Sequence, residues 1–279
     1  MKIVFQPLMT KTEIQFILIT MSQVKNLFVE QEEAKRYNLY RPVYHHLIAE
    51  KLLEFFGQKI KRVLDVACGT GHSTKALAVI CESIVGCDLS DAMLVEARKN
   101  SDIDFLRASA EDLPFKDAEF DYLNISMAFQ WLNQEKFLNE AKRVLHQNGL
   151  LGIDNYGFTG KMIGDDHFLE IYKSFDQTYM KPVPRNKNYP DSKDLGAVKI
   201  KFVQEISYDH HVEMNKQQFI NYLMTRSNFL ELSIIERKSV ELQLNDFYEE
   251  SFEGQNKTLL FRGMIKLFRP TGVNVSICS

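Results

Sequence analysis

The chain has 279 residues, of which 45% are hydrophobic, 25% charged and 11% aromatic. These fractions are ordinary for a globular protein and exclude a disordered, collagen-like or coiled-coil chain. The formal net charge of -3 provides no global basic field, so nucleic acid is not an expected partner.

The N-terminal segment looks like a signal peptide only at first sight. Polar residues interrupt its apolar stretches and no small-residue cleavage site follows. Met21 begins a more hydrophilic stretch and is a candidate alternative start. Residues 1–20 are therefore predicted to be a disordered extension before a single domain at 21–279.

No apolar run reaches the roughly 18 residues of a membrane helix. The four cysteines lack the spacing of a zinc site or disulfide framework. We therefore expect a cytoplasmic protein with no membrane span and no metal.

Apolar periodicity predicts alternating helices and strands through the first half of the domain. An apolar stripe followed by Gly57 predicts a helix at 46–56. Ser90 is the candidate N-cap of a later helix, with Asp91 at its positive end. The other elements expected here are strands at 63–67, 83–88, 103–107, 121–125 and 150–156, and helices at 74–81 and 134–146, the latter ended by Gly149. This alternation indicates parallel βαβ units and a doubly wound α/β sheet with helices on both faces.

The rhythm changes after about residue 157. Asn215 with Gln218 predicts a capping-box variant at the start of a helix. The other expected elements are a helix at 167–179, a half-exposed strand at 198–208 and a last strand at 258–268. We expect the late strands to form an antiparallel edge on a mostly parallel sheet. Residues 157–257 then form a helical cap with the substrate-side segments, and a separate C-terminal domain is the less favoured alternative.

The most informative segment runs from Val63 to His72, where a predicted strand ends in Cys-Gly-Thr-Gly. Ligands of open α/β sheets bind beyond the carboxyl ends of the strands, so this turn is expected to face a cofactor. Glycine lets the backbone approach a ligand and adopt positive φ. The next strand ends in Asp88, 23 residues after Asp65, where an acid can accept hydrogen bonds from both ribose hydroxyls. The two features together predict a nucleoside site.

Two details separate this turn from a dinucleotide site. Thr74 stands where the third glycine of GxGxxG is needed, and Asp65 precedes the glycines. An acid there suits a ligand with an ammonium group, such as S-adenosylmethionine. Two alternatives stay open: a nicotinamide-dependent oxidoreductase and a non-catalytic nucleoside-binding protein. The oxidoreductase is disfavoured because the only TyrxxxLys spacing, Tyr189 to Lys193, lies in a loop segment containing Pro and Asp.

Five segments in the expected order resemble the motifs of class I S-adenosylmethionine-dependent methyltransferases. They read DVACGTG at 65–71, GCDLSDAML at 86–94, ASAEDLPF at 108–115, DYLNISMAFQW at 121–131 and AKRVLHQNG at 141–149. Upstream, YNLYRPVY at 37–44 is similar to an element of small-molecule methyltransferases of the trans-aconitate and quinone-ring kinds. The resemblance implies a Rossmann-like fold, a cofactor-binding core at 60–156, and O- or C-methylation of a small organic acceptor.

The resemblance also implies roles for individual residues. Gly69 and Gly71 would contact the methionine part of the cofactor, with Asp65 near the ammonium. Asp88 would hold the ribose, and Arg41 would pair with the methionine carboxylate. Glu111 and the Ala110 backbone would face the adenine, and Ser126 would lie beside the methionine. The full predicted cofactor-binding set is Arg41, Asp65, Ala67, Gly69, Gly71, Asp88, Leu89, Met93, Ala110, Glu111 and Ser126, with Ala67 standing where a glycine is common.

Phe129, Gln130 and Trp131 are the predicted walls of the acceptor pocket. Phe158 and Tyr222 are further candidates, for which core or cap packing is the favoured alternative. Gln130 stands where relatives often have His, which weakens the case for a histidine base there. No catalytic residue is assigned, because aligning the nucleophile with the methyl group supplies most of the rate enhancement. The candidate bases Tyr156, His167, His210 and His211 are each expected to be structural or exposed. The basic segment 181–187 is interpreted as a solvated loop, with attraction of an acidic acceptor as the alternative. The sequence indicates no oligomeric state.

Overall fold

The computed structural model describes residues 30–99, 101–179, 185–186, 189–190, 200–230 and 232–271. The predicted extension at 1–20 and most of the basic segment at 181–187 lie outside these residues, as does Lys193.

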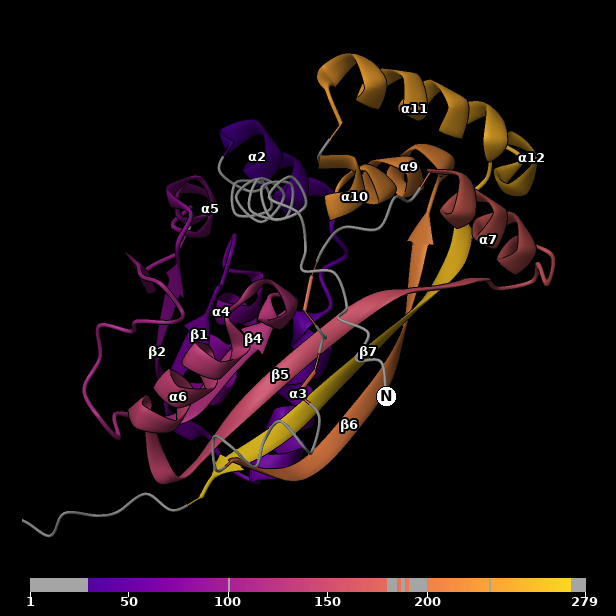
Figure 1. The fold of residues 1–279 in the computed structure, drawn as a ribbon. Coiled ribbons are helices and arrows are strands. Elements are labelled where there is room, and N and C mark those ends of the chain that lie inside the picture. Colours follow the sequence, from indigo (N-terminus) through magenta and orange to yellow (C-terminus); the bar gives the residue numbers. More distant parts are fainter. Residues whose placement is uncertain are drawn as a thin grey trace, which may run out of the picture.

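A seven-stranded sheet forms the centre of the molecule, in the order β3-β2-β1-β4-β5-β7-β6 (Figure 1). The strands are β1 (Ile60–Val66), β2 (Cys81–Asp88), β3 (Asp104–Arg107), β4 (Phe120–Ser126), β5 (Leu145–Met162), β6 (Ile200–Met214) and β7 (Lys257–Pro270). The first five pair in parallel, and β7 lies antiparallel between β5 and β6. The expected doubly wound, mostly parallel sheet with an antiparallel edge region is confirmed.

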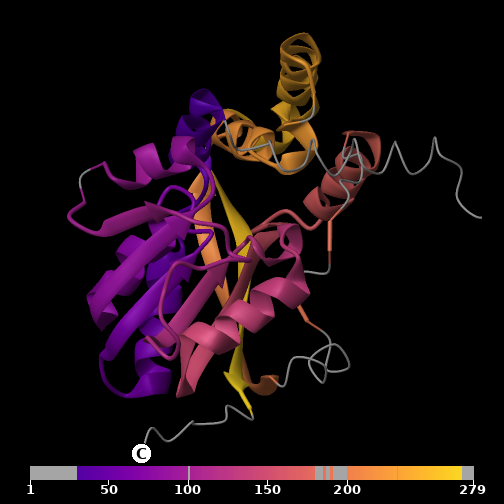
Figure 2. The ribbon, with the colours of Figure 1, turned by 60° about the vertical axis from the view of Figure 1, so that its left-hand side comes forward.

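Helices cover both faces of the sheet and one of its ends. In chain order they are α2 (Gln31–Tyr40), α3 (His45–Phe56), α4 (His72–Leu77), α5 (Asp91–Ala97), α6 (Gln134–Val144), α7 (Phe168–Tyr179), α9 (Lys216–Met224), α10 (Ser227–Leu230), α11 (Ile234–Phe247) and α12 (Glu249–Phe252). Helix α6 lies along one face, and α2 and α9 to α12 gather beyond one end of the sheet (Figures 1 and 2). Two buried clusters, one shared with α3 and the cap and the other with α6, fill the space between these layers. Among the described residues, no helix has the length and apolar character needed to cross a membrane.

Two predicted helix boundaries are wrong. The helix expected at 74–81 is α4, which ends at Leu77, and after a short 3₁₀ turn Cys81 already begins β2. Gly149 does not end α6, because Leu145 adopts an extended backbone and starts β5. A Cβ atom at Gly149 would lie 3.1 Å from the carbonyl oxygen of Phe120, so glycine allows two strands to approach closely there.

The predicted capping box at Asn215 is confirmed, and it leads to a stability prediction. The Asn215 side chain accepts from the Gln218 N–H at 2.8 Å, and the Gln218 side chain accepts from the Asn215 N–H at 2.9 Å. Because the cap satisfies N–H groups that have no partner within the helix, Asn215→Ala is expected to lower the free energy of unfolding by about 1 kcal/mol. Urea denaturation measures this, with Asn215→Ser as the cap-preserving control. Equal stability of the alanine variant and the parent would contradict it.

Candidate active site

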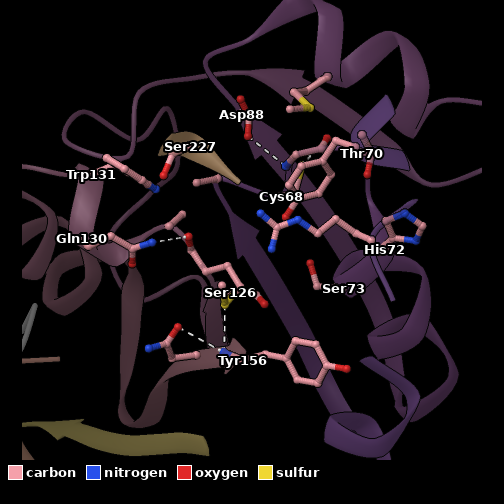
Figure 3. Close-up of a pocket in the computed structure, with 18 of the residues that line it drawn as sticks. Cys68, Thr70, His72, Ser73, Asp88, Ser126, Gln130, Trp131, Tyr156 and Ser227 are labelled. Carbon is pink, nitrogen blue, oxygen red and sulfur yellow. Dashed lines mark hydrogen bonds between the residues drawn. The ribbon is translucent and has the colours of Figure 1, made fainter. Parts of the chain in front are cut away.

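A cavity of about 930 Å³ lies where β1, β2, β3 and β4 end, beside the middle of β5 (Figure 3). Its walls come from the loops after these strands, from the segment between α2 and α3, and from α9 and α10. The cavity therefore lies at the carboxyl ends of the parallel strands, where open α/β sheets bind ligands. Among the described residues, no group of three His, Cys, Asp or Glu side chains could hold a metal ion.

The loop after β1 turns sharply into α4 through residues with positive φ. Ala67, Gly69 and Gly71 have φ values of 52°, 56° and 77°. A Cβ atom at Gly71 would approach the Phe105 ring to 2.9 Å, so both the backbone conformation and the packing require glycine there. Ala67 and Gly69 line the cavity, whereas Gly71 lies behind its wall. Gly71 therefore shapes the turn from behind the cavity wall.

The φ of 52° at Ala67 predicts a small gain in stability when glycine replaces it. A left-handed backbone costs an alanine about 1–2 kcal/mol, while glycine costs about 0.5–1 kcal/mol more to order. Ala67→Gly is thus expected to raise the free energy of unfolding by about 0.5 kcal/mol. Chemical denaturation checks this against Ala76→Gly, which lies in α4 and is expected to destabilise. A loss of stability on Ala67→Gly would mean that the methyl contacts outweigh the backbone strain.

Asp88 lies at the end of β2 and organises the neighbouring loops. One carboxylate oxygen accepts from the Gly69 N–H and the other from the Ser90 N–H, both at 2.8 Å (Figure 3). Burial raises the pKa of Asp88, while these hydrogen bonds lower it. A carboxylate offers about four acceptor positions, so the side chain keeps capacity for a bound ligand. Leu89 and Met93 line the same part of the cavity.

Asp65 does not face the cavity, contrary to its predicted place near an ammonium group. Its carboxylate is fully buried and accepts from the hydroxyls of Ser73 and Thr74, both at 2.6 Å, and from the Asn124 amide at 2.8 Å. Burial raises its pKa, and these three bonds lower it. Asp65 therefore ties the first turn of α4 to β1 and β4, and it supports the cavity from behind.

The loops after β3 and β4 supply the wall near Asp88. Ala110 and Glu111 line the cavity, as predicted. The Glu111 carboxylate accepts from the Ser109 hydroxyl at 3.1 Å and from the Asn133 N–H at 2.7 Å. These bonds connect the two loops and hold the glutamate in place. The nucleoside end of the cavity thus carries acidic groups whose positions are fixed by hydrogen bonds.

Ser126, at the end of β4, belongs to a buried polar cluster below the cavity. Its hydroxyl donates to Asp154 at 2.7 Å, and the Tyr44 hydroxyl donates to the same carboxylate oxygen at 3.1 Å. Burial raises the pKa of Asp154 to about 7. The Ser126 hydroxyl also lies 3.4 Å from Nε2 of His45. This cluster connects β4 and β5 to the segment that precedes α3.

Four buried polar atoms around this cavity have no hydrogen-bond partner within the described structure. They are Arg41 Nε, His45 Nδ1, Thr70 Oγ1 and His72 Nε2. Burial lowers the pKa of His45 to about 3 and that of His72 below its usual value, so both imidazoles are neutral. Unpaired buried polar groups are costly, and a bound ligand can satisfy them. One cation and neutral groups that donate and accept suit a ligand carrying both a carboxylate and an ammonium.

Arg41 is held in place at the junction between the N-terminal segment and the cap. Its Nη2 donates to the Thr225 carbonyl at 3.2 Å, and its guanidinium lies 5.0 Å from the Tyr37 ring centre and 5.6 Å from that of Tyr222. These contacts hold the side chain at the cavity wall.

Of the three residues predicted to wall the acceptor pocket, Gln130 and Trp131 line the cavity and Phe129 does not. Phe129 is 1% exposed and packs against Phe137 in the core. The three residues form a 3₁₀ turn, which sends consecutive side chains in different directions. The Gln130 side chain donates to the Met127 carbonyl at 2.8 Å.

Among the candidate bases, Tyr156 alone lines the cavity. Its hydroxyl lies 2.9 Å from Nδ1 of His210. The side chain of His167 is 88% exposed, and neither it nor His211 reaches the cavity.

Sequence reasoning missed several lining residues, notably His45, His72 and Arg226. His45 directly follows the segment YNLYRPVY at 37–44, and His72 directly follows DVACGTG at 65–71. Their position next to these motifs is the signal that could have identified them. Arg226 comes from the cap, where no motif marks it.

Known proteins have sequences similar to the part of the chain that forms this site. Residues 64–153 match a family model described as a methyltransferase domain. An uncharacterised protein of Methanocaldococcus jannaschii is 30% identical over 185 residues, which are 64% of this chain and 75% of that protein. A malonyl-[acyl-carrier protein] O-methyltransferase of Geobacter sulfurreducens is 32% identical over 177 residues, 60% of this chain and 62% of that enzyme. The chain spans less than two thirds of the length of most curated relatives that it matches.

Solved structures show the same fold. A protein of Anaeromyxobacter dehalogenans superposes with a TM-score of 0.60 at 17% identity, covering 83% of this chain and 97% of that one. At this identity the likeness concerns the arrangement of helices and strands alone.

Proposed function

The chain belongs to the class I S-adenosylmethionine-dependent methyltransferases, and we propose that it methylates a small organic acceptor at oxygen or carbon. The main support for this proposal is the cavity, where Asp88 fixes the glycine loop and four buried polar atoms lack hydrogen-bond partners within the described structure. This donor set fits a nucleoside linked to an amino acid. The relative that acts as an O-methyltransferase supports transfer to oxygen without excluding carbon.

The residues that would hold the cofactor follow from their places in the cavity. Asp88 would bind the ribose, Ala110 and Glu111 would flank the adenine, and Arg41 would pair with the carboxylate. His45, Thr70 and His72 would complete the polar contacts of the amino-acid part. When bound, S-adenosylmethionine supplies an electrophilic methyl group on a positively charged sulfur.

The protein's main contribution to the reaction would be to position the acceptor against the methyl group. Gln130 and Trp131 would align an acceptor against the loop that carries Gly69, and close alignment lowers the entropic barrier to transfer. The neutral state of His45 and His72 keeps additional positive charge away from a cationic ligand. The cap helices would exclude water from the reacting groups. Burial raises the pKa of Tyr156, so its phenol is neutral. Where the acceptor needs to lose a proton, the Tyr156 hydroxyl would take it while passing its own proton to Nδ1 of the neutral His210, 2.9 Å away.

Calorimetric titration with S-adenosylhomocysteine tests the proposal directly. We expect saturable binding with one site, and methyl transfer from labelled S-adenosylmethionine to a component of a metabolite extract. Binding without transfer to any extract would favour the nucleoside-binding alternative. Absence of binding, with saturable enhancement of NADH fluorescence, would favour the oxidoreductase.

We further propose that residues 21–279 form one domain. Support comes from β6 and β7, which pair into the same sheet as the five strands of the cofactor-binding core. Residues 157–257 then supply the cap, β6 and the substrate-side segments, and 258–268 the greater part of β7. Cytoplasmic location and the lack of a nucleic-acid partner stay predictions from the sequence.

A further inference from the structure

The charged side chains that line the cavity are unevenly distributed. The lining carboxylates are Asp88 at the end of β2, Asp91 at the start of α5 and Glu111 on the loop after β3. Arg107, at the end of β3, lines the same part of the cavity and pairs with Asp91 at 3.5 Å. The opposite end, under the cap, has no carboxylate among the described lining residues. Apart from Arg107, the lining cations are four arginines, Arg41, Arg185, Arg226 and Arg262. Because the whole chain has a net charge of -3, this cationic end is a local feature of the cavity.

Some of these arginines already make ion pairs or hydrogen bonds within the chain. Arg262 makes a two-pronged ion pair with Asp209, at 2.6 and 3.0 Å. Arg41 donates to Thr225 and is assigned above to the cofactor carboxylate. Arg185 is exposed at the outer part of the cavity. Arg226, at the junction of α9 and α10, is therefore the partly buried cation best placed to meet an acceptor.

Arg226 is held in place but only weakly neutralised. One of its nitrogens donates to the Tyr172 hydroxyl, and burial raises the pKa of Tyr172 to about 12, so that partner carries no charge. The nearest carboxylate is Asp176, 3.5 Å away and 46% exposed, while the Arg226 side chain is 27% exposed. The Asp176 oxygen at this distance is buried but makes no hydrogen bond to the guanidinium, so the pair offsets only part of the arginine's charge and leaves N–H donors available. A fixed guanidinium facing a cavity is a good receptor for a carboxylate.

The walls beside Arg226 are aromatic. Trp131, Phe158, Tyr172 and Tyr222 all line this end. Phe158 meets Tyr172 edge to face at 4.9 Å between ring centres, so these walls are packed against each other. Such a surface favours a planar or apolar molecular body, and the polar contacts then fix its orientation.

We propose that the methyl acceptor is a small organic carboxylate with an apolar or aromatic body, and that Arg226 binds its charged group. The inference rests on the proposed methyltransferase function and names the substrate class of that site. A monoanion fits better than a dianionic phosphate, because the negative charge of Asp176 lies beside the Arg226 guanidinium. Arg226 is thus a specificity-determining residue for the acceptor, and the cofactor end of the cavity is independent of it.

Binding of three probes of similar shape tests the proposal: benzoate, benzamide and phenylphosphonate. Ligand-observed NMR titrations use the full chain saturated with S-adenosylhomocysteine. Benzoate is expected to bind at least tenfold more tightly than benzamide and no more weakly than phenylphosphonate. Arg226→Gln is expected to remove the preference for benzoate, and Arg226→Lys to retain part of it. Arg269→Gln removes the same charge from an exposed position on β7 and is expected to retain the whole preference.

The result separates the two proposals. Equal binding of benzoate and benzamide, an unchanged preference in Arg226→Gln, or tighter binding of phenylphosphonate would overturn the carboxylate assignment. Failure of S-adenosylhomocysteine to bind the unmodified chain would overturn the methyltransferase proposal instead. The affinity of each variant for S-adenosylhomocysteine verifies that the variant is folded. If Arg226→Gln loses that affinity, the Arg226→Lys variant is used in its place. An undiminished affinity of Arg226→Lys for benzoate would overturn the assignment.

Discussion

Replacing Asp88 by alanine is expected to weaken binding of S-adenosylhomocysteine by about 10- to 100-fold. Hydrogen bonds that involve a charged group contribute about 1.5–3 kcal/mol, and each 1.4 kcal/mol corresponds to a factor of ten in affinity. Part of the loss comes from the ribose contacts. Another part comes from the loop, because the Gly69 N–H loses its acceptor at 2.8 Å. Calorimetry at fixed pH and ionic strength measures the change.

Two further variants separate these contributions. Asp88→Asn keeps one carbonyl oxygen for a backbone N–H and loses the charge, so its affinity is expected to fall between those of the parent and the alanine variant. Asp104→Asn removes a charge from an exposed position on the neighbouring strand β3 and is expected to bind normally. An Asp88→Ala protein that binds as tightly as the parent would remove Asp88 from the cofactor site.

Local signals in the sequence were sufficient for much of the fold. Ser90 was predicted as an N-cap, and its hydroxyl accepts from the Met93 N–H at 3.3 Å. Gly69 and Asp88 were predicted to face one ligand from adjacent strands, and they are joined by a hydrogen bond. Such features depend on residues close in sequence and on the fixed geometry of a βαβ unit.

The direction in which a buried side chain points was not predictable in the same way. Strand β1 is buried on both faces over its last four residues, so the alternation of apolar and polar residues that reveals an outward face is missing. Asp65 was expected to reach a ligand. It is instead satisfied by Ser73 and Thr74, which the short α4 turn brings back over the strand end. A buried carboxylate with three donors is stable there without a ligand.

Residues supplied by the cap were the hardest to foresee. Tyr222 and Arg226 line the cavity although about 150 residues separate them from the glycine loop. Tyr222 was a candidate only through its aromatic character, and Arg226 was not a candidate. Their positions depend on how α9 and α10 fold back over the sheet, and no local pattern specifies that packing. Arg41 was foreseen only through its resemblance to a known element, whereas its contact with Thr225 depends on the same tertiary arrangement.

Replacing Asp154 by asparagine is expected to change how stability depends on pH. Burial raises the pKa of Asp154 to about 7 in the folded chain, whereas an unfolded aspartate titrates near about 3.9. Between these values the unfolded chain loses the proton and the folded chain keeps it. The stability associated with this proton is fully present below about pH 4 and is lost as pH rises through about 7.

The size of the effect follows from the same two values. Integrating the proton difference predicts that the parent loses about 2–3 kcal/mol of unfolding free energy between about pH 5 and pH 8 from this group. Asparagine stays neutral throughout and still offers an acceptor and a donor. The hydroxyls of Tyr44, Ser126 and Tyr208 surround the group at 3.1, 2.7 and 3.4 Å, and hydroxyls can rotate to donate or accept. The variant is therefore expected to gain about 2–3 kcal/mol on the parent over this range.

Urea denaturation at pH 5, 6, 7 and 8 provides the measurement. Asp88, whose pKa burial also raises, is present in both proteins, so its contribution cancels in the difference. The charge of Asp65 helps to raise the pKa of Asp154, so its effect is part of the difference that is measured. Asp154→Ala is the necessary contrast: it is neutral too, but it leaves three buried hydroxyls without their shared partner and is expected to be less stable than Asp154→Asn at every pH. A stability difference between parent and Asp154→Asn that stays constant from pH 5 to pH 8 would mean that the folded chain holds Asp154 ionised. The cluster beneath Ser126 would then place a negative charge, rather than a neutral acid, under the cavity.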